Sequence, residues 1–296
     1  MRERKIFPIN EGILVQLRQL LVLKGYSPST IKTYTNEVGA FLQTIGSRPA
    51  EEFTTQRLKD YLQYCCETLK LSENTLHSRM NALKFLYEQL WKKEKLFWDI
   101  PRPKKQMILP KLLNENELAR LFNSLGNKKH KAMLFTVYSA GLRVSELVNL
   151  RIADIDSRRM QILVQRAKGK KDRYVGLSPV LLDILRSYVK EYKPGPKIFL
   201  FESEQTGSQY PVRTVQAIFG NAKRKAGIRK EVGIHSLRHS FATHLLDKGT
   251  DIKYIKDILG HFSIKTTERY LHVSKKQLVN IVSPFDDLWK RENLDW

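Results

Sequence analysis

One short segment decides how this chain can fold: "WDIPRPKKQMILPK", residues 98–111. It contains three prolines and four basic residues, and it shows neither helical nor strand periodicity. Proline lacks a backbone N–H and has a fixed φ angle, so a helix or a central strand does not run through such a segment. We therefore predict an exposed linker over 99–111 between two domains, 1–98 and 112–296. The 296 residues are enough for both.

The segment before the linker predicts a small all-helical bundle. Apolar residues recur at spacings of three and four over residues 11–24. The same spacing follows a Ser or Thr in "SPSTIKTYTNEVGAFLQTI", "TTQRLKDYLQYCCETL" and "SENTLHSRMNALKFLYEQLWKK". A Ser or Thr in front of such a pattern is typical of a helix N-cap.

The segment after the linker predicts mainly helices with a small antiparallel sheet. Asn114 and Glu117 have the spacing of a capping box, and a further helix follows through "KHKAMLFTVYSA". The stretch "MQILVQRAKGKKDRYVGLS" predicts two strands around a Lys-Gly-Lys-Lys turn. From Pro179 onward the pattern is helical again, with a loop at 194–196.

The charge balance indicates a polyanionic partner. The formal net charge is +22, which favours nucleic acid first and an anionic membrane surface second. No apolar run reaches the ~18 residues of a membrane span. Of the two candidate partners we expect nucleic acid and no membrane. Cys65 and Cys66 are adjacent and fit neither a disulfide framework nor a metal pair, and we expect a reduced, cytoplasmic compartment.

The stretch "LGHFSIKTTERYLHVS", residues 259–274, places a tyrosine nine positions after a histidine. In an unbroken helix, His261 and Tyr270 would face opposite sides, because nine residues turn the chain through about 900°. Gly260 is typical of a helix stop and Ser263 of the cap of a new helix. With that break, the two side chains converge on one site.

Three other stretches place a basic side chain next to the predicted start or end of a helix or strand. Arg143 in "SAGLRVSELVNL" follows Gly141, and Glu146 lies within pairing reach three residues on. Lys168 lies at the end of the first predicted strand. Each of these two motifs alone also fits a surface ion pair or a solvated hairpin tip.

The third stretch, "GIHSLRHSFATHLL", places His235 and Arg238 on one face at a helix start, where backbone amides favour an anion. His235 and His239 also have the spacing of a zinc pair. We expect no metal, because Ser236 stands where the zincin glutamate belongs and a guanidinium opposes a divalent cation. We interpret His239 and His244 as packing residues.

Two arginines, a lysine, two histidines and a tyrosine are a set suited to phosphodiester chemistry without a metal or another cofactor. Guanidinium groups match phosphate oxygens bidentately. A lysine can protonate a leaving alkoxide, and imidazoles can move protons near neutral pH. Local positive charge favours the phenolate of a tyrosine nucleophile.

At this point the sequence resembles the tyrosine recombinase (phage integrase, Xer-like) family over nearly its whole length. The motifs that carry the resemblance are "AGLRVSEL", "AKGKKDR", "HSLRHSFATHLL" and "LGHFSIKTTERYLH", in the order of that family. "YSPSTIKTYTNEVGAFL" is similar to the start of its SAM-like core-binding domain. The resemblance implies a C-terminal catalytic domain of the tyrosine recombinase fold and a clamp around duplex DNA.

The resemblance also implies roles for the motif residues. Tyr270 would attack the scissile phosphate to give a 3′-phosphotyrosine and a free 5′-hydroxyl. Arg143 and Arg238 would hold the non-bridging oxygens, and Glu146 would hold the Arg143 segment.

The other motif residues would move or hold protons. Lys168 would protonate the 5′-oxygen, His235 would act as acid/base or positioning group, and His261 would bind the phosphate. The bond energy kept in the phosphotyrosine would allow resealing without ATP.

Basic helices provide candidates for DNA contact, although each also fits an ordinary solvated face. They are Thr30, Lys32, Thr75, Arg79, Arg213, Thr214, Gln216, Lys223 and Arg224. The tail beyond Ser274 carries apolar residues without a partner on its own domain. In this family, such a tail docks on the neighbouring protomer of a tetrameric synapse.

Two rival functions remain at this level. A type IB topoisomerase shares the chemistry but relaxes supercoils without exchanging partners. A non-catalytic DNA-binding regulator needs the charge and the helices, but not Tyr270 together with both arginines. The expected function is site-specific recombination, such as integration, excision or dimer resolution.

Overall fold

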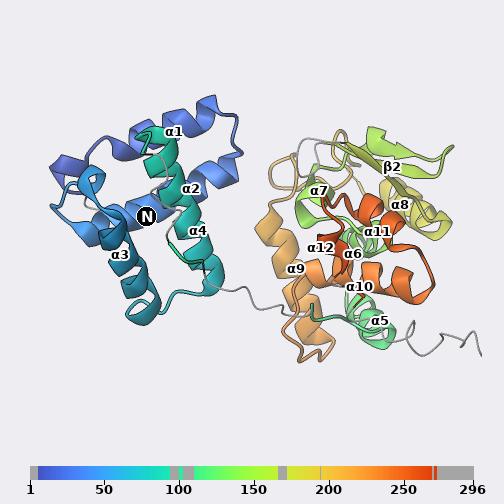
Figure 1. Cartoon of the computed structure of the whole chain (residues 1–296). Helices are drawn as coiled ribbons and strands as arrows, with labels where there is room; N and C mark the ends of the chain where they lie inside the picture. The colour runs from blue at the N-terminus through green and yellow to red at the C-terminus, as the bar shows by residue number, and fades with distance from the viewer. Residues whose placement is uncertain are drawn as a thin grey trace, which may run out of the picture. The chain divides into compact units, whose positions relative to one another are not determined.

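The computed structural model describes residues 6–93, 100–102, 110–165, 172–193, 195–268 and 270–271. The chain divides into two compact units, Met1–Met107 and Ile108–Trp296 (Figure 1). This division falls within the expected linker 99–111, most of which lies outside the described residues. In the part of the chain that is described, no helix has both the length and the apolar character needed to cross a membrane.

The N-terminal unit is a helical bundle, as the Ser and Thr pattern predicts. Its helices are α1 (Ile13–Leu23), α2 (Pro28–Ile45), α3 (Thr55–Glu67) and α4 (Glu73–Lys84), with short 3₁₀ turns at Pro8–Asn10 and Ala50–Glu52. The caps are confirmed, because the side chains of Ser27, Thr54 and Ser72 each accept a hydrogen bond from a first-turn backbone N–H.

One predicted helix of this unit changes type along its length. The pattern over 72–93 predicts a single helix, but α4 ends at Lys84 and continues as a π-helical segment, Phe85–Leu90. The wider segment turns Phe85, Leu86 and Tyr87 into the core. The fully buried apolar side chains of this core include Leu17, Leu21, Phe41, Leu42, Leu58 and Leu83.

The C-terminal unit is mainly helical with a small sheet. Its helices are α5 (Glu115–Asn123), α6 (Lys128–Ala140), α7 (Val144–Asn149), α8 (Pro179–Glu191), α9 (Val212–Lys225), α10 (His235–Asp247), α11 (Ile252–Leu259) and α12 (Lys265–Glu268), with one 3₁₀ turn at Ile152–Asp154. Helix α6 lies in the middle and contacts α5, α7, α8, α9 and α10 (Figure 1). The predicted capping box of α5 is confirmed.

The sheet has one strand more than the sequence pattern predicts. Strands β2 (Gln161–Val164) and β3 (Arg173–Gly176) form the expected antiparallel hairpin, with Ile162 opposite Val175. A two-residue strand, β1 (Ile155–Asp156), pairs with the other edge of β2. Ile162 and Val175 are buried, so this face of the hairpin packs on the helices.

Candidate active site

The site begins at the turn between α6 and α7. Helix α6 ends at Ala140, and the left-handed backbone of Gly141 (φ 60°) sends the chain sharply into α7. A Cβ atom at this position would lie 2.5 Å from the ring of Phe241, so the turn requires glycine. Arg143 is the N-cap of α7, and its backbone N–H donates to Glu146 Oε2 at 2.8 Å. Its guanidinium donates to Glu146 Oε1, also at 2.8 Å, which confirms the predicted ion pair.

Arg173, on β3, is a member of this site that the sequence interpretation missed. Its Nη1 and Nη2 atoms donate to the two carboxylate oxygens of Glu146, each at 2.8 Å, in a bidentate pair. Its Nε donates to the carbonyl of Ile258 at the end of α11. The strand alternation contains the signal that could have found it, because Arg173 and the buried Val175 lie on the same face of β3.

Arg238 reaches the same carboxylate from α10. Its side chain is 3% exposed, and Nη1 lies 3.6 Å from Glu146 Oε2. Nη1 also donates to the carbonyl of Gly141 at 2.7 Å, and Nη2 donates to the carbonyl of Leu259. Both carbonyls lie at helix C-termini, where the helix dipole stabilises a cation.

The four charged groups of this cluster do not balance. Three guanidinium groups, from Arg143, Arg173 and Arg238, surround the single carboxylate of Glu146, which leaves a local formal charge of 3 − 1 = +2. Burial opposes ionisation of Glu146, but its bonds to Arg173 and Arg143 more than offset this and lower its pKa to about 2. Burial and the charge of Arg143 lower the pKa of Arg238 to about 9. An anion placed here would relieve the surplus of positive charge.

His235 begins α10, as the sequence predicts. Partial desolvation and the charges of Arg238 and Arg143 lower its pKa, so its neutral form is favoured near neutral pH. A neutral imidazole offers one hydrogen-bond donor and one acceptor, so it can bind a further group beside the two guanidinium groups without adding to the local charge.

The chain break between His261 and Tyr270 is present. Helix α11 ends at Leu259, Gly260 adopts the left-handed conformation (φ 59°), and α12 begins at Lys265, two residues after Ser263. The rings of His261 and Tyr270 lie 6.5 Å apart between centroids and are nearly parallel, at 13°. The break therefore brings the two side chains together, as the sequence predicts.

The sequence interpretation of His239 as a packing residue is incomplete, because its side chain also makes a hydrogen bond. Its Nδ1 lies 2.8 Å from the hydroxyl oxygen of Tyr270, and the Tyr270 residue is only 1% exposed. His244, five residues further along α10, makes a similar pair with Tyr138 at 2.9 Å. Both imidazoles are therefore hydrogen-bonded to a phenol rather than only packed.

Two of the expected functional elements lie outside the described residues. Lys168 belongs to 166–171, between β2 and β3, and the C-terminal tail belongs to 272–296. Among the residues that the structure does describe, no group of three or more His, Cys, Asp or Glu side chains is arranged to hold a metal ion.

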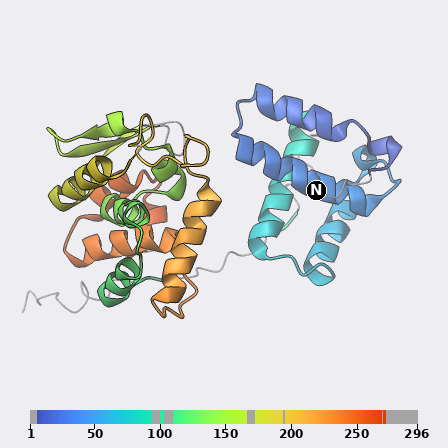
Figure 2. The same cartoon turned by 180° about the vertical axis from the view of Figure 1, so that it is seen from behind.

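The candidates for DNA contact differ in their exposure. Helix α9 turns Val215, Ile218, Phe219 and Ala222 into the core, and it lies at an edge of its unit in both views (Figures 1 and 2). On its outer side, Arg213, Thr214, Gln216 and Arg224 are exposed and Lys223 is partly exposed. In the N-terminal unit, Lys32 is exposed, while Thr30 and Thr75 are partly exposed in the first turns of α2 and α4.

Arg79 does not fit this group. It is 7% exposed, and its Nε donates to Glu37 Oε2 at 2.7 Å. Its Nη1 donates to the hydroxyl of Tyr61 at 2.8 Å. The helical spacing places Arg79 on the face of α4 that packs on α2 and α3, so we interpret it as a structural residue and remove it from the proposed DNA contacts.

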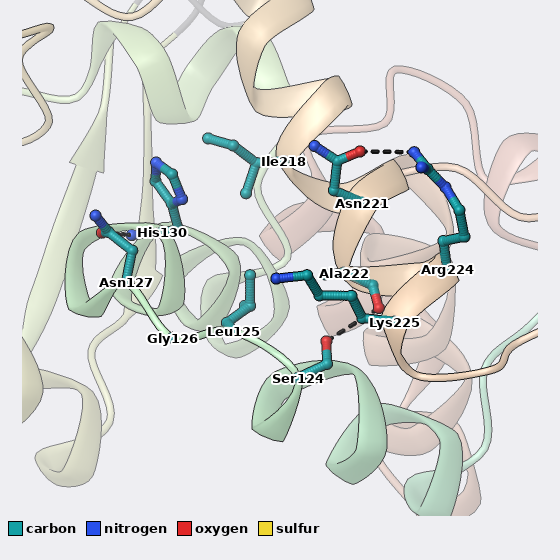
Figure 3. A pocket seen from close by; sticks show the side chains of 10 residues that line it. All are labelled: Ser124, Leu125, Gly126, Asn127, His130, Ile218, Asn221, Ala222, Arg224 and Lys225. Atoms are coloured by element: carbon teal, nitrogen blue, oxygen red, sulfur yellow. Dashed lines mark hydrogen bonds between the residues drawn. The ribbon is translucent and has the colours of Figure 1, made fainter.

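A separate hollow of about 670 Å³ lies between the α5–α6 loop and α9 (Figure 3). Leu125 and Ile218 provide its apolar lining, and Arg224 is turned toward Asn221, with Nη2 2.7 Å from Oδ1. None of the candidate catalytic residues lines this hollow. We therefore do not include it in the site.

Comparison with known proteins identifies the family to which this chain belongs. The phage integrase family matches residues 111–277, and the N-terminal SAM-like domain of phage integrases matches residues 13–95. A putative integrase/recombinase, y4qK of Sinorhizobium fredii, is 35% identical over 281 residues, covering 93% of this chain and 90% of the relative. Tyrosine recombinase XerA of Pyrococcus horikoshii is 34% identical over 284 residues, covering 94% of each chain.

A solved structure shows the same fold. The XerH site-specific recombinase, bound to a palindromic difH substrate in a post-cleavage complex, is 24% identical and superposes with a TM-score of 0.71. The comparison covers 92% of this chain and 85% of XerH. With an arginine cluster, a buried tyrosine and matching family domains over both units, the chain belongs to the phage integrase family and is a tyrosine recombinase.

Proposed function

We propose that this enzyme is a site-specific DNA recombinase that cleaves and rejoins duplex DNA through a 3′-phosphotyrosine at Tyr270. The observation that carries the proposal is the unbalanced charge around Glu146. Buried surplus positive charge is costly unless an anion joins it, and the Tyr270 phenol lies close enough to influence the pKa of Arg238. A phosphodiester supplies the missing negative charge.

In this proposal the arginines provide the electrostatic part of catalysis. Arg143 and Arg238 bind the non-bridging oxygens of the scissile phosphate and stabilise the charge of the pentacoordinate transition state. Arg173 adds positive charge and, with Glu146, fixes the guanidinium of Arg143. The donors are positioned before the substrate binds, so little reorganisation is needed during the reaction.

The remaining groups handle protons and orientation. Lys168 protonates the 5′-oxygen as it leaves, which yields a free 5′-hydroxyl. His235 acts as an acid/base or positioning group beside the arginines. His261, whose Nδ1 is hydrogen-bonded to Thr267 Oγ1 at 2.8 Å, donates from Nε2 to the phosphate. Attack by another 5′-hydroxyl on the phosphotyrosine reseals the strand without ATP.

Duplex DNA is the proposed partner, together with further copies of this chain. Helix α9 in the C-terminal unit and the first turns of α2 and α4 in the N-terminal unit are the proposed contacts with the duplex. The tail beyond Ser274 docks on a neighbouring protomer in a tetrameric synapse. We further propose that the reaction takes place in the cytoplasm. The palindromic substrate of the related XerH supports binding by paired protomers.

The test is capture of a covalent protein–DNA adduct. Wild-type protein incubated with fragmented host DNA gives adducts whose position maps the cleavage site, and a nicked duplex of that site then traps the adduct on a denaturing gel. Tyr270→Phe is expected to abolish the adduct and keep DNA affinity. An adduct that survives this substitution means that another nucleophile acts. Complete absence of adducts favours a regulator, and supercoil relaxation without site preference favours a topoisomerase.

A further inference from the structure

The hydroxyl of Tyr270 has a basic partner in the resting enzyme. Its oxygen lies 2.8 Å from Nδ1 of His239, and the two ring centroids are 5.7 Å apart. In the tautomer that carries its proton on Nε2, the imidazole accepts the hydroxyl proton of Tyr270 through Nδ1. This geometry is within the 2.6–3.2 Å that proton transfer to a general base requires, roughly the length of an ordinary hydrogen bond.

Tyr270 needs such a partner if it is the nucleophile. A phenol with a pKa of about 10 is ionised to only about one part in a thousand at neutral pH, so it attacks slowly without a base. Tyr270 is 1% exposed, so its proton has almost no direct path to bulk water. A protein group within hydrogen-bond distance must take the proton.

The other nearby imidazoles are placed for different tasks. His261 stacks on the Tyr270 ring with nearly parallel planes, and its Nδ1 is hydrogen-bonded to Thr267 Oγ1. His235 lies one turn before His239 on α10, with 6.3 Å between the two ring centroids, and the charges of Arg238 and Arg143 lower its pKa. The hydrogen bond of His239, in contrast, is directed at the nucleophilic oxygen.

We infer that His239 is the general base for Tyr270, an inference that rests on the proposed function. As the phenolic oxygen forms its bond to phosphorus, the hydroxyl proton passes to Nδ1 of His239. The bond from phosphorus to the 5′-oxygen breaks, and that oxygen takes a proton from Lys168. When a 5′-hydroxyl attacks the phosphotyrosine, its proton goes to Lys168, and His239 returns its own proton to Tyr270.

The chain contains a matched control for this pair. His244 lies on the same helix, and its Nδ1 is 2.9 Å from the hydroxyl of Tyr138, with 6.1 Å between ring centroids. Tyr138 lies in α6 and has no part in the proposed chemistry. His244→Ala therefore removes an equivalent hydrogen bond from the same helix without touching the nucleophile.

The first experiment measures single-turnover adduct formation on the nicked duplex that carries the mapped cleavage site. His239→Ala should slow the rate by about 10²–10⁴-fold, the range for loss of a general base. His239→Asn should be as slow as His239→Ala, because the amide can keep the hydrogen bond but cannot carry the proton. His244→Ala should form the adduct at the wild-type rate, and all variants should bind the duplex with wild-type affinity.

The second experiment separates proton transfer from positioning. Replacing Tyr270 by 3,5-difluorotyrosine lowers the pKa of the phenol, so that less help from a base is needed. This replacement should restore most of the rate lost in His239→Ala and none of the rate lost in Arg143→Ala. Full activity of His239→Asn, or no rescue by the fluorinated tyrosine, overturns the assignment of His239 as a base.

The outcome also distinguishes this inference from the proposed function. If the wild-type protein forms no adduct, the proposed function fails. If the wild-type protein forms the adduct and His239→Ala forms it equally fast, the function stands and the inference about His239 is wrong.

Discussion

Each unit of the molecule buries arginine, but the two units balance the charge differently. In the N-terminal unit, Arg79 is paired with one carboxylate, Glu37. In the C-terminal unit, three guanidinium groups share the carboxylate of Glu146. Burial lowers the pKa of Arg79, but Tyr61 and Glu37 more than offset this and leave it raised, whereas the pKa of Arg238 is lowered to about 9. Burial of arginine alone therefore does not mark a functional site, and an unbalanced charge does.

The largest expected effect of this difference is on cleavage. Arg143→Ala and Arg238→Ala should each slow adduct formation by about 10²–10³-fold, because each removes a donor to the transition-state charge. Arg79→Met should leave the cleavage rate of the folded protein unchanged, because its guanidinium faces Glu37 and Tyr61. Single-turnover kinetics on the nicked duplex measures all three. If Arg79→Met has wild-type stability but cleaves slowly, the Arg79–Glu37 pair would be as important for cleavage as the arginines around Glu146, and the distinction between them would be wrong.

The next effect is on stability. Glu146→Gln should lower the free energy of unfolding by about 3–5 kcal/mol, because it leaves buried guanidinium groups without their shared carboxylate. Replacing the balanced pair with apolar residues, as Glu37→Leu with Arg79→Met, should cost much less, because no charge is left unpaired. Urea unfolding of both variants makes the comparison. Equal losses would mean that the surplus charge of the C-terminal cluster has no energetic consequence.

Acid titration tests the carboxylate of the C-terminal cluster. The pKa of Glu146 lies at about 2, below its ordinary value of 4.5, so its contribution to stability is complete above pH 4.5 and is lost as pH falls to 2. That contribution is on the order of 3 kcal/mol. The wild-type protein should lose this stability across the window, and Glu146→Gln should show a flatter dependence on pH. Parallel curves for the two proteins would contradict the assigned pKa.

The smallest expected effect concerns the exposed cations. Arg213 lies exposed at the start of α9, so Arg213→Ala should weaken DNA binding only a few-fold and equally for all sequences. The slope of log affinity against log salt should decrease by about 1, the change for one lost phosphate contact. Affinity measured across a salt series tests this. An unchanged slope would place α9 away from the DNA backbone.

Periodicity and caps predict much of this structure because they report local chemistry. The Ser and Thr caps, the Asn114–Glu117 capping box and the stop at Gly260 all depend on residues within one turn of each other. The third strand, β1, has only two residues, Ile155–Asp156, and is too short to leave a pattern. The π-helical segment after Lys84 depends on tertiary packing, which the spacing of apolar residues does not report.

The site was harder to predict because its contacts join distant residues. Arg79 is a basic residue on a helix, which is what a DNA contact requires. Its pairing with Glu37 depends on the packing of α4 on α2, which the sequence alone does not show. Arg173 and His239 lie inside recognised motifs, but their partners are 27 and 31 residues away along the chain. A single sequence shows which side chains are present, while their partners depend on how α10, α11 and β3 pack.

The backbone carbonyls that bind Arg173 and Arg238 also affect local unfolding of the C-terminal unit. Arg238 is bound to the carbonyls of Gly141 and Leu259, and Arg173 to that of Ile258, so α6, α7, α10, α11 and β3 share one buried network. Local opening of any of these elements would leave a buried guanidinium without its hydrogen-bond partners. We therefore expect their slowest amide protons to exchange with solvent together, as one cooperative unit.

The segment that carries the nucleophile is outside that network. Helix α12 has four residues, Lys265–Glu268, and is tied to the rest by the His261–Thr267 and His239–Tyr270 hydrogen bonds and by packing of the Tyr270 ring. Its amides should exchange much sooner than those of α10. The segment can then adjust toward a phosphate, with the Tyr270 hydroxyl still within reach of His239, while the groups that bind the phosphate remain fixed.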